Sequence, residues 1–217
     1  MNCLVSANRP TFSPSLWLAS QPLLLASGSP SRAKILSEAD IPFEVSIPQV
    51  NERALEAMIA IGPHRPRRIA ATLARAKACD VSACHPNRLV LGGDQLLAVD
   101  GEIVHKAADL EEARATLRRL SGRTHQLQCA ACLARDGEAV FEIATAASLT
   151  LHPLSDDFID RYLAVTGEDI LGSVGCYHVE GIGVQLFAQI VGDHWTVRGL
   201  PLLPLLAFLR ESGYLCR

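Results

Sequence analysis

A short polar segment near the start of the chain has the residue types of a phosphate-binding turn. It reads SGSPSR over residues 27–32 and follows an apolar run. Ser29 is a good N-cap and Pro30 fits the first helical position, which predicts a helix here. Free N–H groups at a helix start attract anions, and the forked guanidinium of Arg32 suits phosphate. The spacing of a Walker loop is missing, so a simple capped helix stays an alternative.

A second segment that could take part in chemistry is Gly92-Gly93-Asp94-Gln95, after the short strand expected over 89–91. Glycines let the backbone come close to a ligand. A predicted hairpin around Asp100-Gly101, a preferred type I′ turn, returns Lys106 towards Asp94. Strict alternation would put Asp94 and Lys106 on opposite faces. Their cooperation therefore requires a bulge or a splayed strand end, and the alternative is a pair of solvated surface charges.

Two further charged residues complete the candidate set. Glu52 follows an apolar strand and Pro48, and Lys77 lies near the end of an otherwise apolar helix. Each alone is typical of a surface charge. Together the candidates supply two carboxylates, Glu52 and Asp94, with three cations, Arg32, Lys77 and Lys106. Oxygen ligands for a metal and cations for phosphates are what a magnesium–polyphosphate site requires.

The cysteines carry no comparable signal. The chain has seven, and without an export signal reduced thiols in a cytoplasm are expected. Cys129 and Cys132 form a CxxC motif inside an expected strand, 125–134, where positions i and i+3 face opposite sides. That geometry suits neither a disulfide nor shared metal ligation. Buried thiols used as small core side chains are the expectation.

The elements that must position these residues alternate without a regular repeat. Strands are expected over 22–26, 43–47, 89–91, 96–99, 102–105 and 184–190, and on both sides of Asp136-Gly137. Helices are expected from residue 30, over 65–78 and 110–120, from Ser155, and from about 200 to 211. Asp109 with Glu112 forms a capping box. Hairpins mixed with helices indicate a mixed α/β fold.

Composition limits the class of protein. The chain has 217 residues, 49% hydrophobic and 20% charged, which excludes a disordered chain, a collagen and a coiled coil. The net charge of −3 argues against a nucleic-acid binder but allows a local basic pocket. No apolar stretch reaches 18 residues, so no membrane span is predicted. Residues 1–21 lack the pattern of a signal peptide and are expected to form a loose extension before one domain, 22–217.

Several motifs, in order, resemble the Maf family of nucleoside triphosphate pyrophosphatases from Pro22 to the C-terminus. They are SxSxxR at 27–32, Glu52, Lys77-Ala78, Gly92-Gly93-Asp94, Lys106, Ser121-Gly122 with His125, Tyr162, Gly167-Glu168, Gly175 with Tyr177 and Gly181, and Gly199-Leu200-Pro201. The resemblance implies an α/β fold, with a mixed elongated sheet, helices and two lobes around a central cleft, as in inosine triphosphatases. It implies hydrolysis of a nucleoside triphosphate to the monophosphate and pyrophosphate with Mg²⁺ or Mn²⁺.

The resemblance also implies roles for individual residues. Asp94 would accept the proton of the attacking water, Glu52 and Asp94 would hold the metal, and Lys106 would act beside them. The implied substrate-binding set is Ser27, Ser29, Ser31, Arg32, Lys77, Gln95 and Glu180. A base and neutralisation of the leaving pyrophosphate are both needed for attack at the α-phosphorus.

Three family positions that tune base choice match Ser31, Gln95 and Glu180. The branch that prefers 7-methyl-GTP carries Trp, Gln and Glu there, and the branch that prefers dTTP and UTP carries Arg, Thr and Gln. Gln offers a donor and an acceptor and a Glu carboxylate only accepts, which suits guanine more than uracil or thymine. The preferred base stays open because Ser31 replaces the stacking Trp.

At two places near the candidate site the sequence differs from the family pattern. His105 and Ala107 replace Gly and Pro around Lys106. Gly172-Ser173 stands where many members carry an Asp, whose role could shift to Glu168 or Asp169.

The sequence leaves two classes of function open. One is a cytoplasmic house-cleaning enzyme for modified or noncanonical nucleotides, with no nucleic-acid or membrane partner and with a homodimer as an option. The other is a nucleotide-binding regulator, for instance of cell division, with weak or no turnover. The intact Asp94, Glu52 and Lys106 favour the enzyme, and the departure at Gly172 favours the regulator.

Overall fold

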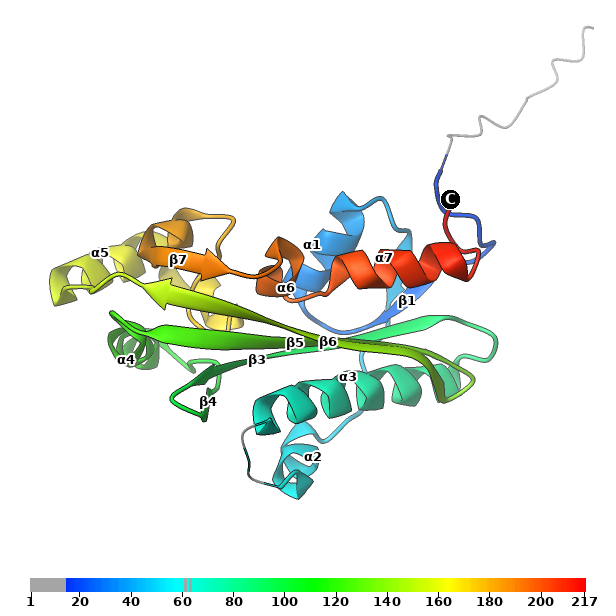
Figure 1. Ribbon diagram of the computed structural model, residues 1–217, viewed down its shortest axis with the longest axis horizontal. Coiled ribbons are helices and arrows are strands. Elements are labelled where there is room, and N and C mark those ends of the chain that lie inside the picture. Colours follow the sequence, from blue (N-terminus) through cyan, green and yellow to red (C-terminus); the bar gives the residue numbers. More distant parts are fainter. Residues whose placement is uncertain (1–14, 61, 63) are drawn as a thin grey trace, which may run out of the picture.

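The computed structural model describes residues 15–60, 62 and 64–217, and it contains one 7-stranded mixed sheet with helices on both faces (Figure 1). The strand order is β2-β1-β3-β5-β6-β7, with β4 paired to β3. Strands β2, β1 and β3 are parallel, and the remaining pairs are antiparallel. The mixed, elongated α/β sheet predicted from the sequence is confirmed.

The strands are β1 (Leu23–Ala26), β2 (Phe43–Val45), β3 (Val90–Val99), β4 (Glu102–Val104), β5 (Thr124–Arg135), β6 (Glu138–Leu151) and β7 (Phe187–Val191). The helices are α1 (Pro30–Glu38), α2 (Glu52–Met58), α3 (Arg65–Cys84), α4 (Leu110–Leu120), α5 (Asp156–Thr166), α6 (His194–Arg198) and α7 (Leu202–Glu211), with 3-10 helices at Gly167–Gly172 and Ile182–Leu186. Figure 1 shows α3 along one face of the sheet and α1, α6 and α7 along the other.

Local sequence signals account for many element boundaries. Ser29, Asp109 and Ser155 each accept a backbone N–H three residues on, as N-caps do. Asp100-Gly101 and Asp136-Gly137 have positive φ at both residues, as a type I′ turn demands. The predicted N-caps and both hairpin turns are therefore confirmed. In the predicted capping box, Glu112 Oε2 accepts from Ala108 N, one residue before the N-cap Asp109.

The predicted break in the third strand is wrong. Gly92 to Gln95 do not form a loop between a strand and a hairpin arm, because β3 runs unbroken from Val90 to Val99. Strand β5 is long enough to pair with every one of these residues, from Val90 opposite Ala134 to Ala98 opposite Gln126. The continuous backbone ladder outweighs the weak strand preference of two glycines.

Other boundaries differ by less. Strand β2 ends at Val45, α3 continues past Ala78 to Cys84, and β7 lies at 187–191 because a 3-10 helix occupies 182–186. Helices α2 and α6 were not predicted. Each is short and is capped by a side chain, Asn51 for α2 and Asp193 for α6.

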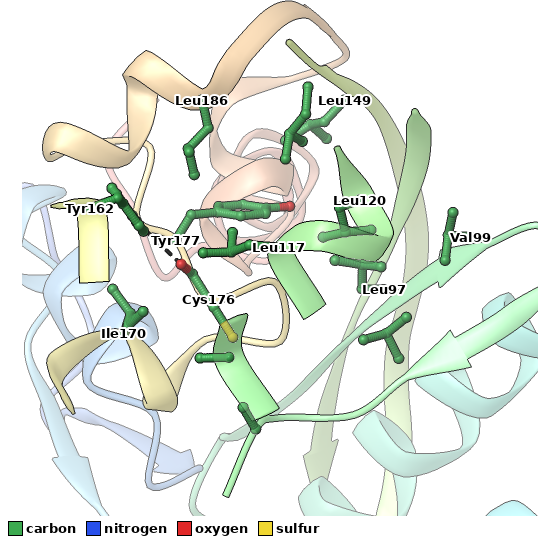
Figure 2. Packing of buried hydrophobic residues seen from close by; sticks show 14 of the residues in the cluster. Leu97, Val99, Leu117, Leu120, Leu149, Tyr162, Ile170, Cys176, Tyr177 and Leu186 are labelled. Atoms are coloured by element: carbon green, nitrogen blue, oxygen red, sulfur yellow. Dashed lines mark hydrogen bonds between the residues drawn. The ribbon is translucent and has the colours of Figure 1, made fainter. Parts of the chain in front are cut away.

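The apolar core falls into clusters at the two ends of the sheet. One cluster packs β5, β6, α4, α5 and the 3-10 segments, as Figure 2 shows for Leu117, Leu149, Tyr177 and Leu186. The other packs β1, α1 and α7, and α3 covers β3 and β5 through a third group. The first cluster carries Tyr177 and the second carries α1, and both contribute to the cavity described below.

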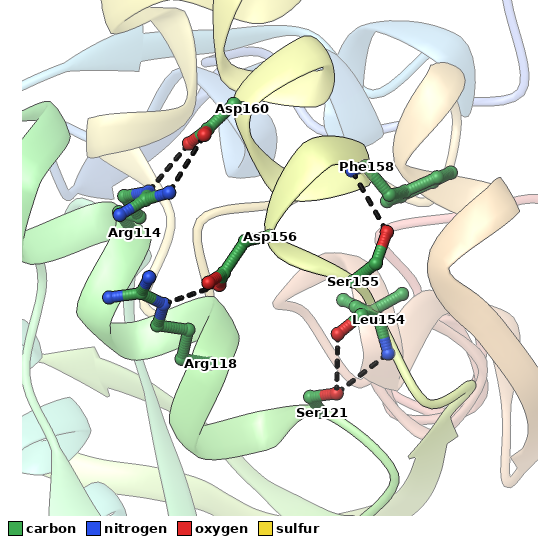
Figure 3. Close-up of polar contacts among 8 residues, drawn as sticks. All are labelled: Arg114, Arg118, Ser121, Leu154, Ser155, Asp156, Phe158 and Asp160. Atoms are coloured by element: carbon green, nitrogen blue, oxygen red, sulfur yellow. Dashed lines mark hydrogen bonds and ion pairs between the residues drawn. The ribbon is translucent and has the colours of Figure 1, made fainter.

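Helices α4 and α5 are joined at the surface (Figure 3). Arg114 pairs with Asp160 and Arg118 pairs with Asp156, at 2.7 Å for Arg118 Nε to Asp156 Oδ1. Ser121 Oγ accepts from Leu154 N at 2.7 Å. Exposed pairs contribute little stability, so the shared apolar cluster holds this end together.

The described end of the expected N-terminal extension contacts the C-terminus. Leu18 N donates to Tyr214 O at 2.8 Å and Cys216 N donates to Leu16 O at 2.9 Å. The Trp17 and Tyr214 rings lie 5.8 Å apart between centroids. Residues 1–14 lie outside the described part, and the division at residue 22 stays a prediction. In the part of the chain described, no helix has the length and apolar character to cross a membrane.

Candidate active site

A cavity of about 930 Å³ opens between the two ends of the sheet. Every site residue predicted from the sequence lines it: Ser27, Ser29, Ser31, Arg32, Glu52, Lys77, Asp94, Gln95, Lys106 and Glu180. These residues come from segments spread over more than half of the chain. The fold therefore brings together what the sequence analysis selected.

The centre of the cavity is an acid–lysine–acid group. Lys77 Nζ lies 2.7 Å from Asp94 Oδ1 and 2.9 Å from Glu52 Oε1. The Lys77 and Asp94 side chains are 8% and 9% exposed, and that of Glu52 is 53% exposed. Asp94 Oδ2 is buried and makes no hydrogen bond to any described residue. The second oxygen of Asp94 is therefore an acceptor that no described residue uses.

The two glycines before Asp94 make room for the protein itself. A Cβ on Gly92 would lie 2.2 Å from the carbonyl oxygen of Ala74, so α3 packs directly against the backbone of β3. A Cβ on Gly93 would lie 3.0 Å from Arg32 Nε. The expectation that these glycines let the backbone approach a ligand is wrong for Gly92. Gly92 thus lets α3, which carries Lys77, pack closely against β3, which carries Asp94, and Gly93 makes room for the Arg32 side chain.

Arg32 is fixed by polar contacts on two sides. Its Nη1 donates to Ser27 Oγ at 2.9 Å and its Nε donates to Gly199 O at 3.0 Å. Ser27 Oγ also accepts from Ser29 N at 3.3 Å. A buried guanidinium at a helix start, held in one orientation, is a suitable partner for a phosphate group.

Lys106 reaches the same cavity because strand pairing stops before it. The β3–β4 ladder ends at Leu97 opposite Val104, so alternation no longer governs Lys106. The splayed strand end that its spacing requires is present. Burial, with the positive charges of Arg32 and Lys77, lowers the pKa of Lys106, and the carboxylates of Glu52 and Asp94 oppose this shift.

Another part of the cavity wall is built on α6. Gln95 Nε2 donates to the carbonyls of Thr196 and Val197 at 2.9 and 3.1 Å. Both contacts use the amide nitrogen, so Oε1, which lies beside Gly199, is the polar atom of this side chain that is left to accept from a ligand. Gln95 was expected to offer a ligand both a donor and an acceptor. Because its amide nitrogen is already bonded to α6, it offers only an acceptor.

Several lining residues were missed by the sequence analysis. They are Arg53, Glu56, Arg65, His178 and Arg198, the last 3.8 Å from Glu180 through its Nε. Arg198 stands directly before the Gly199-Leu200-Pro201 motif, and that adjacency was the available signal. Six Lys or Arg and four Asp or Glu line the cavity, so its wall is positive in a chain of net charge −3.

The residues at the centre can supply part of the coordination shell of a divalent cation. Within the described residues no three His, Cys, Asp or Glu side chains come together as a metal site. Glu52 and Asp94 are close enough to share Lys77, and the free Asp94 Oδ2 is an oxygen ligand without a partner. Mg²⁺ is usually held by one or two carboxylates, with substrate phosphates and water completing the shell. This donor set fits that pattern.

The departure at Gly172-Ser173 is not compensated as expected. Gly172 and Ser173 line the cavity, whereas Glu168 and Asp169 are exposed and do not line it. The suggestion that either acidic residue takes over a role near the metal is therefore wrong, because the 3-10 helix that carries them points them to solvent.

Other residues of the family pattern belong mainly to the core. His125 Nε2 lies 2.6 Å from the hydroxyl of Tyr177, and both are buried. Burial lowers the pKa of His125 to about 4. Cys129 and Cys132 are buried free thiols whose pKa burial raises to about 12. As expected, these cysteines are packing residues and not reactive groups.

Comparison with known proteins identifies the family. The family model described as "Maf-like protein" matches residues 22–212. A 7-methyl-GTP pyrophosphatase of Rhizobium etli is 47% identical over 191 residues, covering 88% of this chain and 96% of that protein. A nucleoside triphosphate pyrophosphatase of Rhodopseudomonas palustris is 48% identical over 200 residues, with coverages of 92% and 98%. The chain is also similar to a solved dITP/XTP pyrophosphatase from Mycobacterium abscessus, at 16% identity and a TM-score of 0.39. The match covers 89% of this chain and 95% of the solved chain, but at this distance it carries no conclusion about function. The match of nearly the whole chain shows that this protein belongs to the Maf family.

Proposed function

We propose that this protein hydrolyses a nucleoside triphosphate to the monophosphate and pyrophosphate. The observation that carries the proposal is the buried Oδ2 of Asp94, which no described residue uses, on a side chain that lines the cavity together with Arg32, Lys77 and Lys106. A base next to clustered cations is what attack of water on a polyphosphate requires. The names of the similar Maf proteins support the same reaction.

In the proposed reaction, Asp94 takes a proton from water as the water oxygen bonds to the α-phosphorus. The bond from that phosphorus to the bridging oxygen breaks, and pyrophosphate leaves with the electron pair. Arg32 and Lys106 neutralise the charge that develops on the phosphate oxygens. Lys77 orients the Asp94 carboxylate through its 2.7 Å contact with Oδ1. Glu52 and Asp94 would hold Mg²⁺ or Mn²⁺, which when bound neutralises phosphate charge.

We propose a guanine-type or modified base for the substrate. Gln95 Oε1 and the Glu180 carboxylate are both acceptors, and both residues line the cavity. The N1–H and 2-amino groups of guanine are donors, whereas the O2 and O4 atoms of uracil and thymine are acceptors. Ser31 supplies no aromatic stacking surface, so 7-methyl-GTP and GTP are both candidates, with dTTP and UTP as the competing reading.

The test is pyrophosphate release from GTP, 7-methyl-GTP, UTP and dTTP, with Mg²⁺, with Mn²⁺ and with chelator. We expect metal-dependent release, faster for the guanine nucleotides. Release of orthophosphate in place of pyrophosphate would overturn the reaction assigned, and preference for UTP or dTTP would overturn the base assigned.

A nucleotide-binding regulator is the second candidate. The observation that favours it is the absence of a carboxylate at Gly172-Ser173 in the cavity wall. Tight nucleotide binding with no pyrophosphate release under any of these metal conditions would support it over the enzyme. A homodimer and a cytoplasmic location stay predictions.

A further inference from the structure

Arg198 has contacts that the proposed chemistry leaves unexplained. Its side chain is 5% exposed although it lines the cavity. Nη1 lies 2.6 Å from Glu38 Oε2, and the guanidinium lies 5.2 Å from the centroid of the Trp195 ring. Nε is buried and makes no hydrogen bond to a described residue. The guanidinium is therefore held from two sides, and its buried Nε–H has no acceptor among the described residues.

The carboxylate of Glu180 is the acceptor that this donor faces. Glu180 Oε1 lies 3.8 Å from Arg198 Nε, beyond a hydrogen bond by less than 1 Å. A buried donor without a partner is unfavourable, and a charge-assisted bond to a carboxylate is among the strongest that could satisfy it. A small movement of Glu180 would form that bond. Glu38, Arg198 and Glu180 thus make a row of alternating charge that leads from α1 into the cavity.

We propose that Arg198 is a positioning residue for base recognition, which orients the Glu180 carboxylate towards the donor groups of a guanine-type base. The same short segment orients the other acceptor, since the carbonyls of Thr196 and Val197 hold the Gln95 amide. Helix α6 therefore sets both acceptors of the base end. This inference rests on the proposed function.

The variants are Arg198→Met and Arg198→Lys, with Arg88→Met as the matched control. Arg88 also has a buried Nε without a partner and pairs with a glutamate, Glu44, at 2.9 Å, but it lies outside the cavity lining. Glu38→Gln is a milder variant that weakens the hold on Arg198 from outside the cavity. Affinities for GMP and UMP, inhibition by inorganic tripolyphosphate, and KM and kcat for GTP and UTP are measured.

We expect Arg198→Met to raise the GMP dissociation constant and the GTP KM about 10-fold, with kcat within about 3-fold and with UMP and tripolyphosphate affinity unchanged. For Arg198→Lys and Glu38→Gln, the GMP dissociation constant and the GTP KM should lie between those of Arg198→Met and those of the unaltered chain. Arg88→Met should lower the melting temperature without moving the ratio of GMP to UMP affinity. In an Glu180→Gln background, Arg198→Met should have little further effect, since its partner is already altered.

An unchanged ratio of GMP to UMP affinity in Arg198→Met would overturn the inference. Equal loss of GMP, UMP and tripolyphosphate affinity would overturn it too, because that pattern indicates a general structural role. The monophosphate measurements need no turnover. A protein that binds GMP selectively through Arg198 but releases no pyrophosphate would overturn the proposed function alone.

Discussion

Arg32 Nε donates a hydrogen bond to the backbone carbonyl of Gly199 at 3.0 Å, across 167 residues of sequence. This bond ties the start of α1, at the phosphate end of the cavity, to the segment whose preceding residues hold Gln95. The proposed phosphate-binding arginine and the proposed base-binding glutamine are therefore held by one piece of backbone, residues 196–199. A substitution at the phosphate end has consequences that depend on whether this tie survives.

Arg32→Ala is expected to weaken nucleoside triphosphate binding more than monophosphate binding. The guanidinium lies at the helix start, where the additional phosphates would lie. Titration of the same nucleoside as tri- and monophosphate measures the difference, with Arg32→Lys as the variant that keeps the charge and loses the fork. Equal loss for both ligands would assign Arg32 to the tie with Gly199 and not to phosphate.

Asp94→Asn is expected to abolish turnover and to keep nucleotide binding. The shape is preserved, Lys77 retains its 2.9 Å contact with Glu52, and a positioned base contributes about 10²–10⁴-fold. Pyrophosphate release and nucleotide affinity are measured on the same folded preparation. Turnover close to that of the unaltered chain would remove Asp94 from the role of base.

Lys77→Met is expected to destabilise the fold. It leaves the Asp94 carboxylate buried with no cation in contact, and breaking such a pair typically costs about 3–5 kcal/mol. Denaturant unfolding measures the loss. The double variant Lys77→Met with Asp94→Asn should recover a large part of it, because the uncompensated charge is gone. A double variant as unstable as the single one would contradict this account.

The stability of the fold should fall as the pH drops from about 6.5 towards about 4. Burial holds the pKa of His125 at about 4, below its ordinary value of 6.5. In this window the unfolded chain binds a proton that the folded chain excludes, so acid favours unfolding, by up to about 3 kcal/mol. Below pH 4 both states are protonated and this contribution levels off.

His125→Gln removes this titration and keeps a polar partner for the Tyr177 hydroxyl. The free energy of unfolding, measured across this range for both proteins, should show a shallower decline in the variant. Parallel curves would mean that His125 does not titrate differently in the two states.

Local signals in the sequence were sufficient for much of the fold. Ser29, Asp109 and Ser155 cap helices through contacts three residues away, which a sequence displays directly. The unbroken course of β3 through Gly92 was not predictable in this way, because it depends on a partner strand some 40 residues later in the chain. Pairing between distant strands leaves no local mark.

For the candidate site too, residues in local motifs were predicted and residues that depend on distant partners were not. Residues in compact motifs, such as those at 27–32, and charged residues of the family pattern were found and lie together. Arg198 was missed, since its partner Glu38 is 160 residues away and a single arginine is typical of a surface. The glycines were recognised but their contacts were misassigned, because the partner of Gly92 is the backbone of α3.

The excess of cations on the cavity wall affects how fast a substrate arrives. A nucleotide with several negative charges approaches a molecule of net charge −3 that repels it at long range, except where the wall of the cavity is positive. Such a field guides diffusion towards the opening, and at about 0.15 M salt it is screened beyond about 8 Å. We expect the second-order rate constant for nucleotide binding to fall as ionic strength rises. The first-order rate constant for dissociation of the bound complex should change little. Stopped-flow binding of a fluorescent nucleotide at several salt concentrations separates the two.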